Sequence, residues 1–333
     1  MESRHSRILE NNVECLVCER RCRIPSGRKG FCRNRMNIGG RLYYLYYGCL
    51  SAIEPRPIEV KPLYHYYPGS TALTFSGYGC NFPCPWCQNW ALSKADPAIM
   101  GCDYVSPEQL VLEAINTGCR GVCASFNEPT IHLEYVLDVS RIARDHGLYS
   151  CIVTNGYMTL DSLRDMLEAG ITGYSIDIKG CPDTYRKFLA ADPEIVFRNA
   201  KYILDRGGHV EMVYLVIPRA NDWEECVEYV LSRHHDLLGE NVPLHINKYY
   251  PAYKYHEPPT PLETLLKIKE KAVREYNIRY VYIGNTFHYE LQDTVCPSCG
   301  KKVIIRRPGY ILNRLTSDHR CPRCGEKIPI YEG

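Results

Sequence analysis

The chain has 333 residues, of which 45% are hydrophobic, a length that suits one barrel-sized domain with one or two small appendages. Its 18 cysteines would indicate a disulfide scaffold only in a short secreted chain. The first residues are charged, no apolar leader follows them, and no apolar run approaches the roughly 20 residues that a membrane span needs. We therefore expect a cytoplasmic protein with no membrane partner, whose clustered cysteines bind metal or act in catalysis.

Both ends of the chain are basic. Residues 1–35 carry nine Lys/Arg and four Asp/Glu, and residues 296–333 carry eight and three. Such ends can meet nucleic acid, but metal-binding knuckles also carry Lys and Arg that offset thiolate charge. We favour the second interpretation and do not expect nucleic acid as a partner.

The first cysteine cluster has the spacing Cys15-x2-Cys18-x3-Cys22-x9-Cys32. Four thiolates can close a metal site, and zinc or an auxiliary four-iron cluster would both satisfy them. Several prolines follow, which suit an extended connector rather than a contact with another cluster, so we expect zinc slightly more than iron. Residues 1–70 are therefore interpreted as a metal-binding segment with a connector.

From residue 71 to residue 290, short β-rich runs alternate with amphipathic helical patterns. This alternation predicts a parallel sheet, and six or seven such units predict a partial or full α/β barrel with its chemistry at the C-terminal strand ends. Ser106 before Pro107 is typical of a helix start. The expected strands are 72–77, 121–126, 149–154, 173–178, 210–217, 244–248 and 279–283. The expected helices are 107–117, 132–146, 160–169, 195–206, 222–237 and 261–276.

The central cluster, Cys80-x3-Cys84-x2-Cys87, follows the first expected barrel strand directly. A closed iron–sulfur cubane takes four thiolates, so a loop that offers three leaves one iron without a protein ligand. An open coordination position is what a catalytic metal needs. A three-cysteine zinc site or a chance cluster is the alternative.

The third cluster, in residues 291–333, pairs Cys296-x2-Cys299 with Cys321-x2-Cys324. A glycine after each pair lets the backbone fold around a metal, which predicts a structural zinc ribbon, with rubredoxin-like iron as the competing interpretation. Because metal would supply the ribbon's folding energy, we expect its deletion to leave a folded barrel. The remaining cysteines are expected to be small buried hydrophobes: Cys49, Cys102, Cys119, Cys123, Cys151, Cys181 and Cys226.

The central cluster resembles the signature of the radical S-adenosylmethionine (SAM) superfamily, in which an aromatic residue, here Trp86, precedes the last cysteine. The resemblance implies a [4Fe-4S] cluster whose open iron is chelated by SAM. It also implies one-electron cleavage of SAM to a 5′-deoxyadenosyl radical that abstracts hydrogen from a substrate. A reducing donor such as ferredoxin or flavodoxin is implied as a partner.

Further segments resemble family motifs in the same order. Residues 125–129 (Ser-Phe-Asn-Glu-Pro) resemble Gly-Gly-Glu-Pro, residues 154–156 and 177–179 resemble strand-end motifs of glycyl-radical-enzyme activases, and residues 213–221 resemble a strand that covers adenine. The alternatives are a strand-end turn, a buried pair between Asp177 and Lys179, and an ordinary barrel strand. No catalytic residue is assigned. The resemblance implies these cofactor-binding residues: Trp86, Asn127, Glu128, Thr154, Asn155, Asp177, Lys179 and Val216.

A closer resemblance, to the radical SAM member of the AmmeMemoRadiSam group, covers nearly the whole chain. It rests on long collinear segments that include residues 27–32, 57–69, 87–90, 127–130 and 244–251. That group is similar to pyruvate formate-lyase activating enzymes, which implies an oxidoreductase acting on a protein or a small molecule. An RNA-modifying radical enzyme and a non-catalytic metal-binding interaction module are the alternatives.

Overall fold

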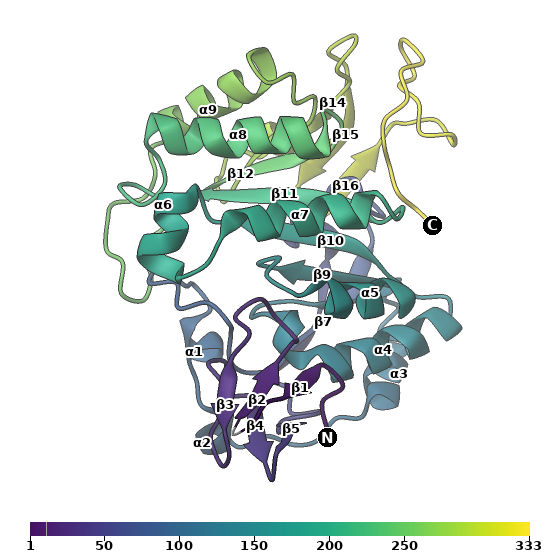
Figure 1. The fold of residues 1–333 in the computed structure, drawn as a ribbon. Helices are drawn as coiled ribbons and strands as arrows, with labels where there is room; N and C mark the ends of the chain where they lie inside the picture. Colours follow the sequence, from purple (N-terminus) through teal and green to yellow (C-terminus); the bar gives the residue numbers. More distant parts are fainter. Residues whose placement is uncertain (11) are drawn as a thin grey trace. The chain divides into compact units, whose positions relative to one another are not determined.

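The computed structural model describes residues 1–10 and 12–333, which divide into two compact units (Figure 1). Unit 1 comprises Met1–Arg56 and Thr71–Tyr174, and unit 2 comprises Pro57–Ser70 and Ser175–Gly333. The main sheet has eight strands in the order β13-β12-β11-β10-β9-β8-β7-β6. Its registers are parallel for β7 with β8, β8 with β9, β11 with β12, and β12 with β13. The expected α/β fold is confirmed.

Unit 1 combines strand–helix repeats with small antiparallel sheets near the N-terminus. Helix α3 packs against β7 and β8, and α4 packs against β8 and β9. Ser106 accepts a hydrogen bond from Gln109 N–H, and the Gln109 side chain accepts one from Ser106 N–H, so this helix begins at a capping box before Pro107 as expected. The strands are β1 (Ser6–Ile8), β2 (Asn12–Cys15), β3 (Arg23–Pro25), β4 (Arg35–Ile38), β5 (Arg41–Tyr44), β6 (Ala52–Pro57), β7 (Thr71–Ser76), β8 (Gly121–Ala124) and β9 (Tyr149–Thr154). The helices are α1 (Trp90–Ser93), α2 (Pro97–Met100), α3 (Pro107–Asn116), η2 (Pro129–His132), α4 (Leu133–Asp145) and α5 (Leu160–Glu168).

Unit 2 continues the strand–helix alternation and ends in a small antiparallel sheet, β14-β15-β16. Helix α7 packs against β11, and α9 packs against β12 and β13. The strands are β10 (Ile171–Ile178, which begins in unit 1), β11 (His209–Val216), β12 (Leu244–Lys248), β13 (Val281–Gly284), β14 (Thr294–Val295), β15 (Lys302–Arg307) and β16 (Tyr310–Asn313). The helical segments are η1 (Ile58–Val60), α6 (Pro182–Thr184), η3 (Tyr185–Leu189), α7 (Pro193–Leu204), α8 (Glu224–Leu238), α9 (Leu262–Arg274) and η4 (Tyr289–Gln292). Among the described helices, none is long and apolar enough to cross a membrane.

Two expectations about the first hundred residues are wrong. The expected extended connector contains strand β6, which joins the main sheet beside β7. An edge strand tolerates Pro55 and Pro57 because one of its sides makes no ladder hydrogen bonds. Cys49 and Cys102, expected as isolated buried hydrophobes, form a disulfide with a Cα–Cα distance of 5.5 Å. The two cysteines are 53 residues apart in sequence, so no local pattern predicted this disulfide, which the fold of unit 1 creates.

A buried carboxylate organises the start of the strands in unit 2. Glu211 of β11 accepts hydrogen bonds from the His65 N–H (2.7 Å), His209 Nε2 (3.0 Å) and His245 Nε2 (2.7 Å). Burial alone would raise its pKa, but the bonds from the two imidazoles hold the pKa of Glu211 well below its usual range. His65 and His245 therefore have structural partners at the N-terminal strand ends, where residues of such folds serve stability.

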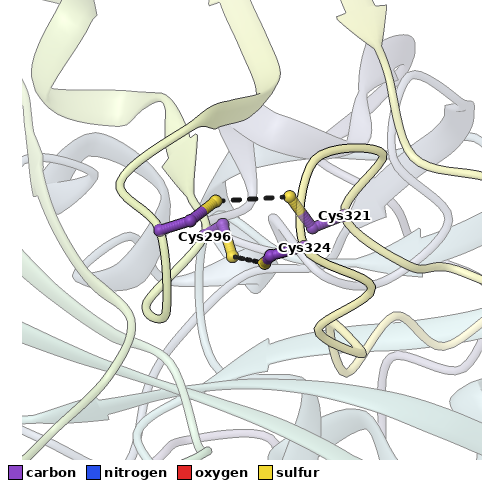
Figure 2. A group of neighbouring side chains, drawn as sticks. Cys296, Cys321 and Cys324 are labelled. Atoms are coloured by element: carbon purple, nitrogen blue, oxygen red, sulfur yellow. Dashed lines mark hydrogen bonds between the residues drawn. The ribbon is translucent and has the colours of Figure 1, made fainter.

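The C-terminal ribbon folds as two matching knuckles. Gly300 N–H donates to Cys296 O, and Gly325 N–H donates to Cys321 O, each at 2.9 Å. Both glycines have a positive φ, 71° and 77°, which explains the glycine after each cysteine pair. The Sγ atoms of Cys296, Cys299, Cys321 and Cys324 all lie within 4.8 Å of one another (Figure 2).

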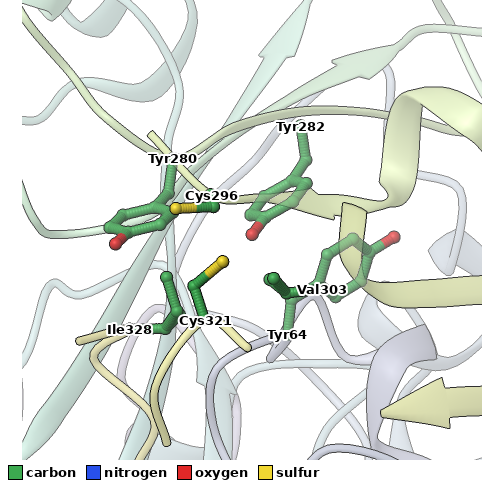
Figure 3. Close-up of a cluster of buried hydrophobic side chains, with 7 residues drawn as sticks. All are labelled: Tyr64, Tyr280, Tyr282, Cys296, Val303, Cys321 and Ile328. Carbon is green, nitrogen blue, oxygen red and sulfur yellow. The ribbon is translucent and has the colours of Figure 1, made fainter. Parts of the chain in front are cut away.

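The ribbon shares one hydrophobic core with the rest of unit 2. Figure 3 shows Val303 and Ile328 of the ribbon gathered with Tyr64, Tyr280 and Tyr282, and all of these side chains are buried. Arg306 of β15 reinforces this packing, because its guanidinium donates to the carbonyl of Tyr64 at 2.7 Å. The ribbon is thus built into unit 2, which contradicts the expectation that it can be removed freely.

Deleting residues 296–333 should destabilise unit 2, because it uncovers Tyr64, Tyr280 and Tyr282, each a ring with on the order of 150 Å² or more to bury. We expect low soluble yield or a lower melting temperature, measured by circular dichroism at matched concentration. Tyr310→Ala, which alters an exposed ribbon side chain, is the control and should melt like the parent. A soluble truncation with an unchanged melting temperature would instead make the ribbon an independent appendage.

Candidate functional site

The three central cysteines lie on the loop that joins β7 to α1 in unit 1. Cys84 is buried, and Cys80 and Cys87 are partly exposed. The buried rings of Phe82 and Trp86 anchor the loop, and Lys94 Nζ donates to Phe82 O at 2.6 Å. The loop therefore presents its three thiols from a backbone that is fixed by packing.

Two asparagine side chains tie this loop to the ends of the neighbouring strands. Asn127, after β8, donates through Nδ2 to the carbonyls of Gly77 and Gly79, each at 2.9 Å. Asn155, after β9, donates through Nδ2 to Asn81 Oδ1 at 2.7 Å. Asn127 and Asn155 were predicted from sequence, whereas Asn81 was missed, although its place directly after Cys80 is a usable signal.

Glu128 connects the same two strand ends. Its Oε1 accepts from the Thr130 N–H (3.0 Å), Thr130 Oγ1 (2.6 Å) and Thr154 Oγ1 (2.7 Å), and its Oε2 accepts from the Asn155 N–H (2.8 Å). Burial raises the pKa of Glu128, and these hydrogen bonds oppose the rise. The structure thus brings Glu128, Thr154 and Asn155 into one network, whereas the Asn127 side chain bonds to the loop and to His132.

Phe126 adopts a backbone conformation that favours glycine, with φ of 66°. The family motif that this segment resembles has glycine at this position. A bulky residue with a positive φ costs on the order of 1–3 kcal/mol in conformational energy. The side chain of Asn89 donates to Phe126 O at 2.6 Å and so supports the turn. Asn89 belongs to the segment Cys-Gln-Asn-Trp that begins at Cys87, so sequence comparison of that segment could have identified it.

The central thiols suit a cluster better than one metal ion. Among residues 1–10 and 12–333, the C-terminal quartet is the one group of three or more His, Cys, Asp or Glu side chains whose ligand atoms all lie within 4.8 Å of one another. Cys80, Cys84 and Cys87 do not form such a group, and a cubane does not require one because each thiolate binds a different iron. Burial of its sulfur raises the pKa of Cys80 to about 12, which opposes ionisation of the thiol when no metal is bound.

The C-terminal quartet has the geometry of a single tetrahedral ion. The Sγ atoms of Cys296 and Cys324 are 3.5 Å apart, and those of Cys299 and Cys321 are 3.6 Å apart. Metal–sulfur bonds of about 2.3 Å place tetrahedral thiolates roughly 3.8 Å apart. Four thiolates leave no open position, so this site is structural rather than catalytic.

The other predicted cofactor residues belong to unit 2. Lys179 Nζ forms an ion pair with Asp177 Oδ2 at 2.7 Å, as the alternative interpretation of these residues expected. Val216 ends β11 fully buried, and its carbonyl accepts from Thr260 Oγ1 at 2.6 Å. Asn221, which ended the quoted adenine-strand motif without being singled out, donates through Nδ2 to Lys179 O at 2.9 Å and fixes the end of β10.

The N-terminal cysteines Cys15, Cys18, Cys22 and Cys32 line one pocket of unit 1. No three of their sulfurs satisfy the 4.8 Å spacing that the C-terminal quartet meets. The metal at this quartet, zinc or a second iron–sulfur cluster, stays a prediction.

Comparison with known proteins agrees with this geometry. The model of the radical SAM superfamily matches residues 74–230. Uncharacterized protein MJ0808 of Methanocaldococcus jannaschii is 37% identical over 310 residues, which cover 93% of this chain and 91% of that protein. Pyruvate formate-lyase 1-activating enzyme of Escherichia coli (strain K12) is 26% identical over 163 residues, 46% of this chain and 64% of that enzyme.

Among solved structures, Streptococcus suis SuiB bound to S-adenosylmethionine is similar with a TM-score of 0.52. The identity is 12%, and the match covers 68% of this chain and 55% of SuiB, so this likeness concerns the fold alone. The superfamily match contains the three-thiol loop and the Glu128 network described above. The chain belongs to the radical SAM superfamily and, within it, to the same family as protein MJ0808.

Proposed function

We propose that the chain is a radical SAM oxidoreductase that acts on a protein or a small molecule in the manner of an activating enzyme. The three-thiol loop after β7 is the observation that carries this proposal. When bound there, a [4Fe-4S] cluster supplies one electron that splits SAM into methionine and a 5′-deoxyadenosyl radical, which takes a hydrogen atom from the substrate. Similarity to the Escherichia coli activating enzyme supports the comparison with activases.

The chain's own residues hold and orient in this proposal. Cys80, Cys84 and Cys87 are the cluster ligands, and the buried rings beside them keep water away. Asn127 and Glu128 act as positioning residues, because their polar atoms are already committed to the loop and to the neighbouring strand ends. This rigid support fixes the thiols before cofactor binds, which lowers the cost of assembling the site.

Lys179 is proposed to meet the carboxylate of SAM. Its side chain is mostly buried and pairs with Asp177, so the ammonium group is held at a defined point at the end of β10. A lysine provides a compact positive charge that suits a carboxylate. A donor of the ferredoxin or flavodoxin class and a cytoplasmic location complete the proposal.

Replacing Cys80, Cys84 and Cys87 together by alanine should abolish reductant-dependent formation of 5′-deoxyadenosine from SAM. The reason is that the cluster loses its three protein ligands, so no open iron is held for SAM to bind. Anaerobic assays with dithionite, followed by chromatography of the nucleoside product, measure this directly. Cys119→Ala removes a buried thiol outside the three clusters and should retain activity. Cleavage of SAM by the triple variant would refute the proposed function.

Lys179→Ala should weaken SAM binding about tenfold or more, since a hydrogen bond to a charged group contributes roughly 1.5–3 kcal/mol. Equilibrium binding by calorimetry, with iron content measured in parallel, tests this. Lys201→Ala is the matched control, because it also breaks a lysine–aspartate pair. Lys201 Nζ lies 2.9 Å from Asp205 Oδ1, and both side chains are exposed. If Lys179→Ala changes the melting temperature but leaves the SAM dissociation constant unchanged, Lys179 only closes a structural ion pair.

A further inference from the structure

The N-terminal cysteines converge although they come from different segments of a small antiparallel sheet. Cys15 ends β2, Cys22 directly precedes β3, and Cys32 lies between β3 and β4. With Cys18 they line one pocket, whose remaining wall is mainly apolar and includes Val17, Ile24, Phe31 and Ile131. Cysteines from such separate segments meet in one apolar pocket when their thiolates bind the same metal centre.

The spacing of these four thiols distinguishes between ligands. A tetrahedral zinc ion draws four sulfurs to roughly 3.8 Å from one another, and the C-terminal quartet meets this requirement without any ion. The N-terminal quartet does not, since no three of its sulfurs lie within 4.8 Å of one another. In a cubane each thiolate binds a different corner iron, so the sulfurs stand farther apart. The spacing therefore does not favour a single zinc ion, and it is compatible with a four-iron cluster in which protein ligates all four irons.

The N-terminal pocket lies directly against the loop that carries the central thiols. Asn81, the residue after Cys80, lines the same pocket as the N-terminal quartet, and Arg20 Nε donates to the Asn81 carbonyl. Asn34 Nδ2 bridges the two segments by donating to the carbonyls of Cys32 and Tyr78, each at 2.9 Å. These contacts belong to one compact unit.

A glycine permits this close approach. A Cβ atom on Gly79 would lie 2.5 Å from Asn34 Nδ2 and 2.9 Å from Cys32 O, closer than such atoms can approach. Gly79 also has a φ of 90°, which other residues rarely adopt. The contact between the cysteine-rich N-terminal segment and the central loop is therefore built into the backbone.

A residue that lines this pocket carries a buried donor without an acceptor among the described residues. Asn81 is fully buried, its Oδ1 accepts from Asn155, and its Nδ2 has no hydrogen-bond partner within residues 1–10 and 12–333. A buried amide that makes no hydrogen bond costs free energy. The sulfurs of an iron–sulfur cluster accept hydrogen bonds, and such bonds tune its reduction potential.

We propose that Cys15, Cys18, Cys22 and Cys32 hold a second [4Fe-4S] cluster that relays electrons to the cluster on Cys80, Cys84 and Cys87. The relay takes one electron from a reduced donor of the ferredoxin or flavodoxin class and passes that electron to the central cluster. No bond forms or breaks at the N-terminal site, because its four irons have no open position. The relay rests on the proposed function, whereas the presence of the second cluster does not.

Metal analysis of the full chain, purified and reconstituted anaerobically, tests the cluster. The parent should hold about eight iron and one zinc per chain, and the alanine variant of Cys80, Cys84 and Cys87 should keep about four iron and one zinc. That variant should also give the electron paramagnetic resonance signal of a reduced cubane after dithionite. If it contains two zinc and no iron, the N-terminal quartet is a zinc site and the proposal is overturned.

A reciprocal variant checks the ligands. Replacing all four N-terminal cysteines by alanine should leave about four iron and one zinc per chain. If this quadruple variant does not fold, the single variant Cys22→Ala, which removes one partly exposed ligand, is used in its place. Loss of zinc with an unchanged iron content would contradict the proposal. Cys119→Ala should keep the parent's metal content.

Magnetic coupling tests the relay itself. In the fully reduced parent, two adjacent paramagnetic clusters should give a spectrum that differs from the sum of the spectra of the two cluster-deletion variants. A spectrum equal to that sum would refute a relay between adjacent clusters. Because iron content and spectra are read without SAM, a chain that binds both clusters but fails to cleave SAM would refute the proposed function and leave the second cluster standing.

Discussion

The carboxylate of Glu128 is buried and therefore needs hydrogen-bond donors, and the site in unit 1 is organised around that need. A buried carboxylate without donors would cost several kcal/mol, so the ends of β8 and β9 must stay where Thr130, Thr154 and Asn155 can reach it. Asn155 then holds Asn81, the residue next to the first central thiol. The hydrogen-bond network of this buried carboxyl group thus helps to hold the loop that carries the thiols.

Unit 1 contains a second buried carboxylate whose need for hydrogen-bond donors fixes the structure, near the N-terminal cysteines. Arg35 is buried and donates to both carboxylate oxygens of Glu134, at 2.8 and 2.6 Å, and also to Ser3 Oγ at 2.6 Å. The adjacent Arg35 guanidinium holds the pKa of Glu134 below its usual range although burial opposes this. A bidentate pair fixes both position and orientation. It therefore joins the start of β4 to helix α4 and keeps the cysteine-rich segment against the strand–helix part of unit 1.

Unit 2 places its buried structural contacts and its proposed cofactor-binding residues at opposite ends of its strands. Glu211 and its histidine donors lie near the N-terminal ends, beside the core that the ribbon completes, whereas Asp177, Lys179 and Asn221 lie at the C-terminal ends. In strand–helix folds the C-terminal ends carry the chemistry and the opposite ends carry stability. The ribbon's metal site, closed by four thiolates, fits the structural role.

The local pattern of the sequence was sufficient for the repeating elements. Strands β9 and β12 begin and end where the alternation of apolar residues predicted, and α3 begins at Ser106 and Pro107, because each of these signals acts within a few residues. The spacing of the cysteines likewise predicted the C-terminal quartet, whose four sulfurs the fold brings together, because one metal ion requires neighbouring thiolates. The three-thiol loop and its place after the first parallel strand were therefore predictable from sequence.

What the sequence could not decide depends on contacts between distant residues. The disulfide between Cys49 and Cys102, the burial of the ribbon against Tyr64 and Tyr280, and strand β6 all arise from packing that no local pattern encodes. The two four-cysteine segments illustrate the same limit. Both allow zinc or iron by spacing along the chain, but the fold brings one set of sulfurs within reach of a single ion and holds the other apart. The sequence determined which residues can bind metal, and only the tertiary structure decided how far apart their sulfurs lie, because that distance is set by the backbones that carry them.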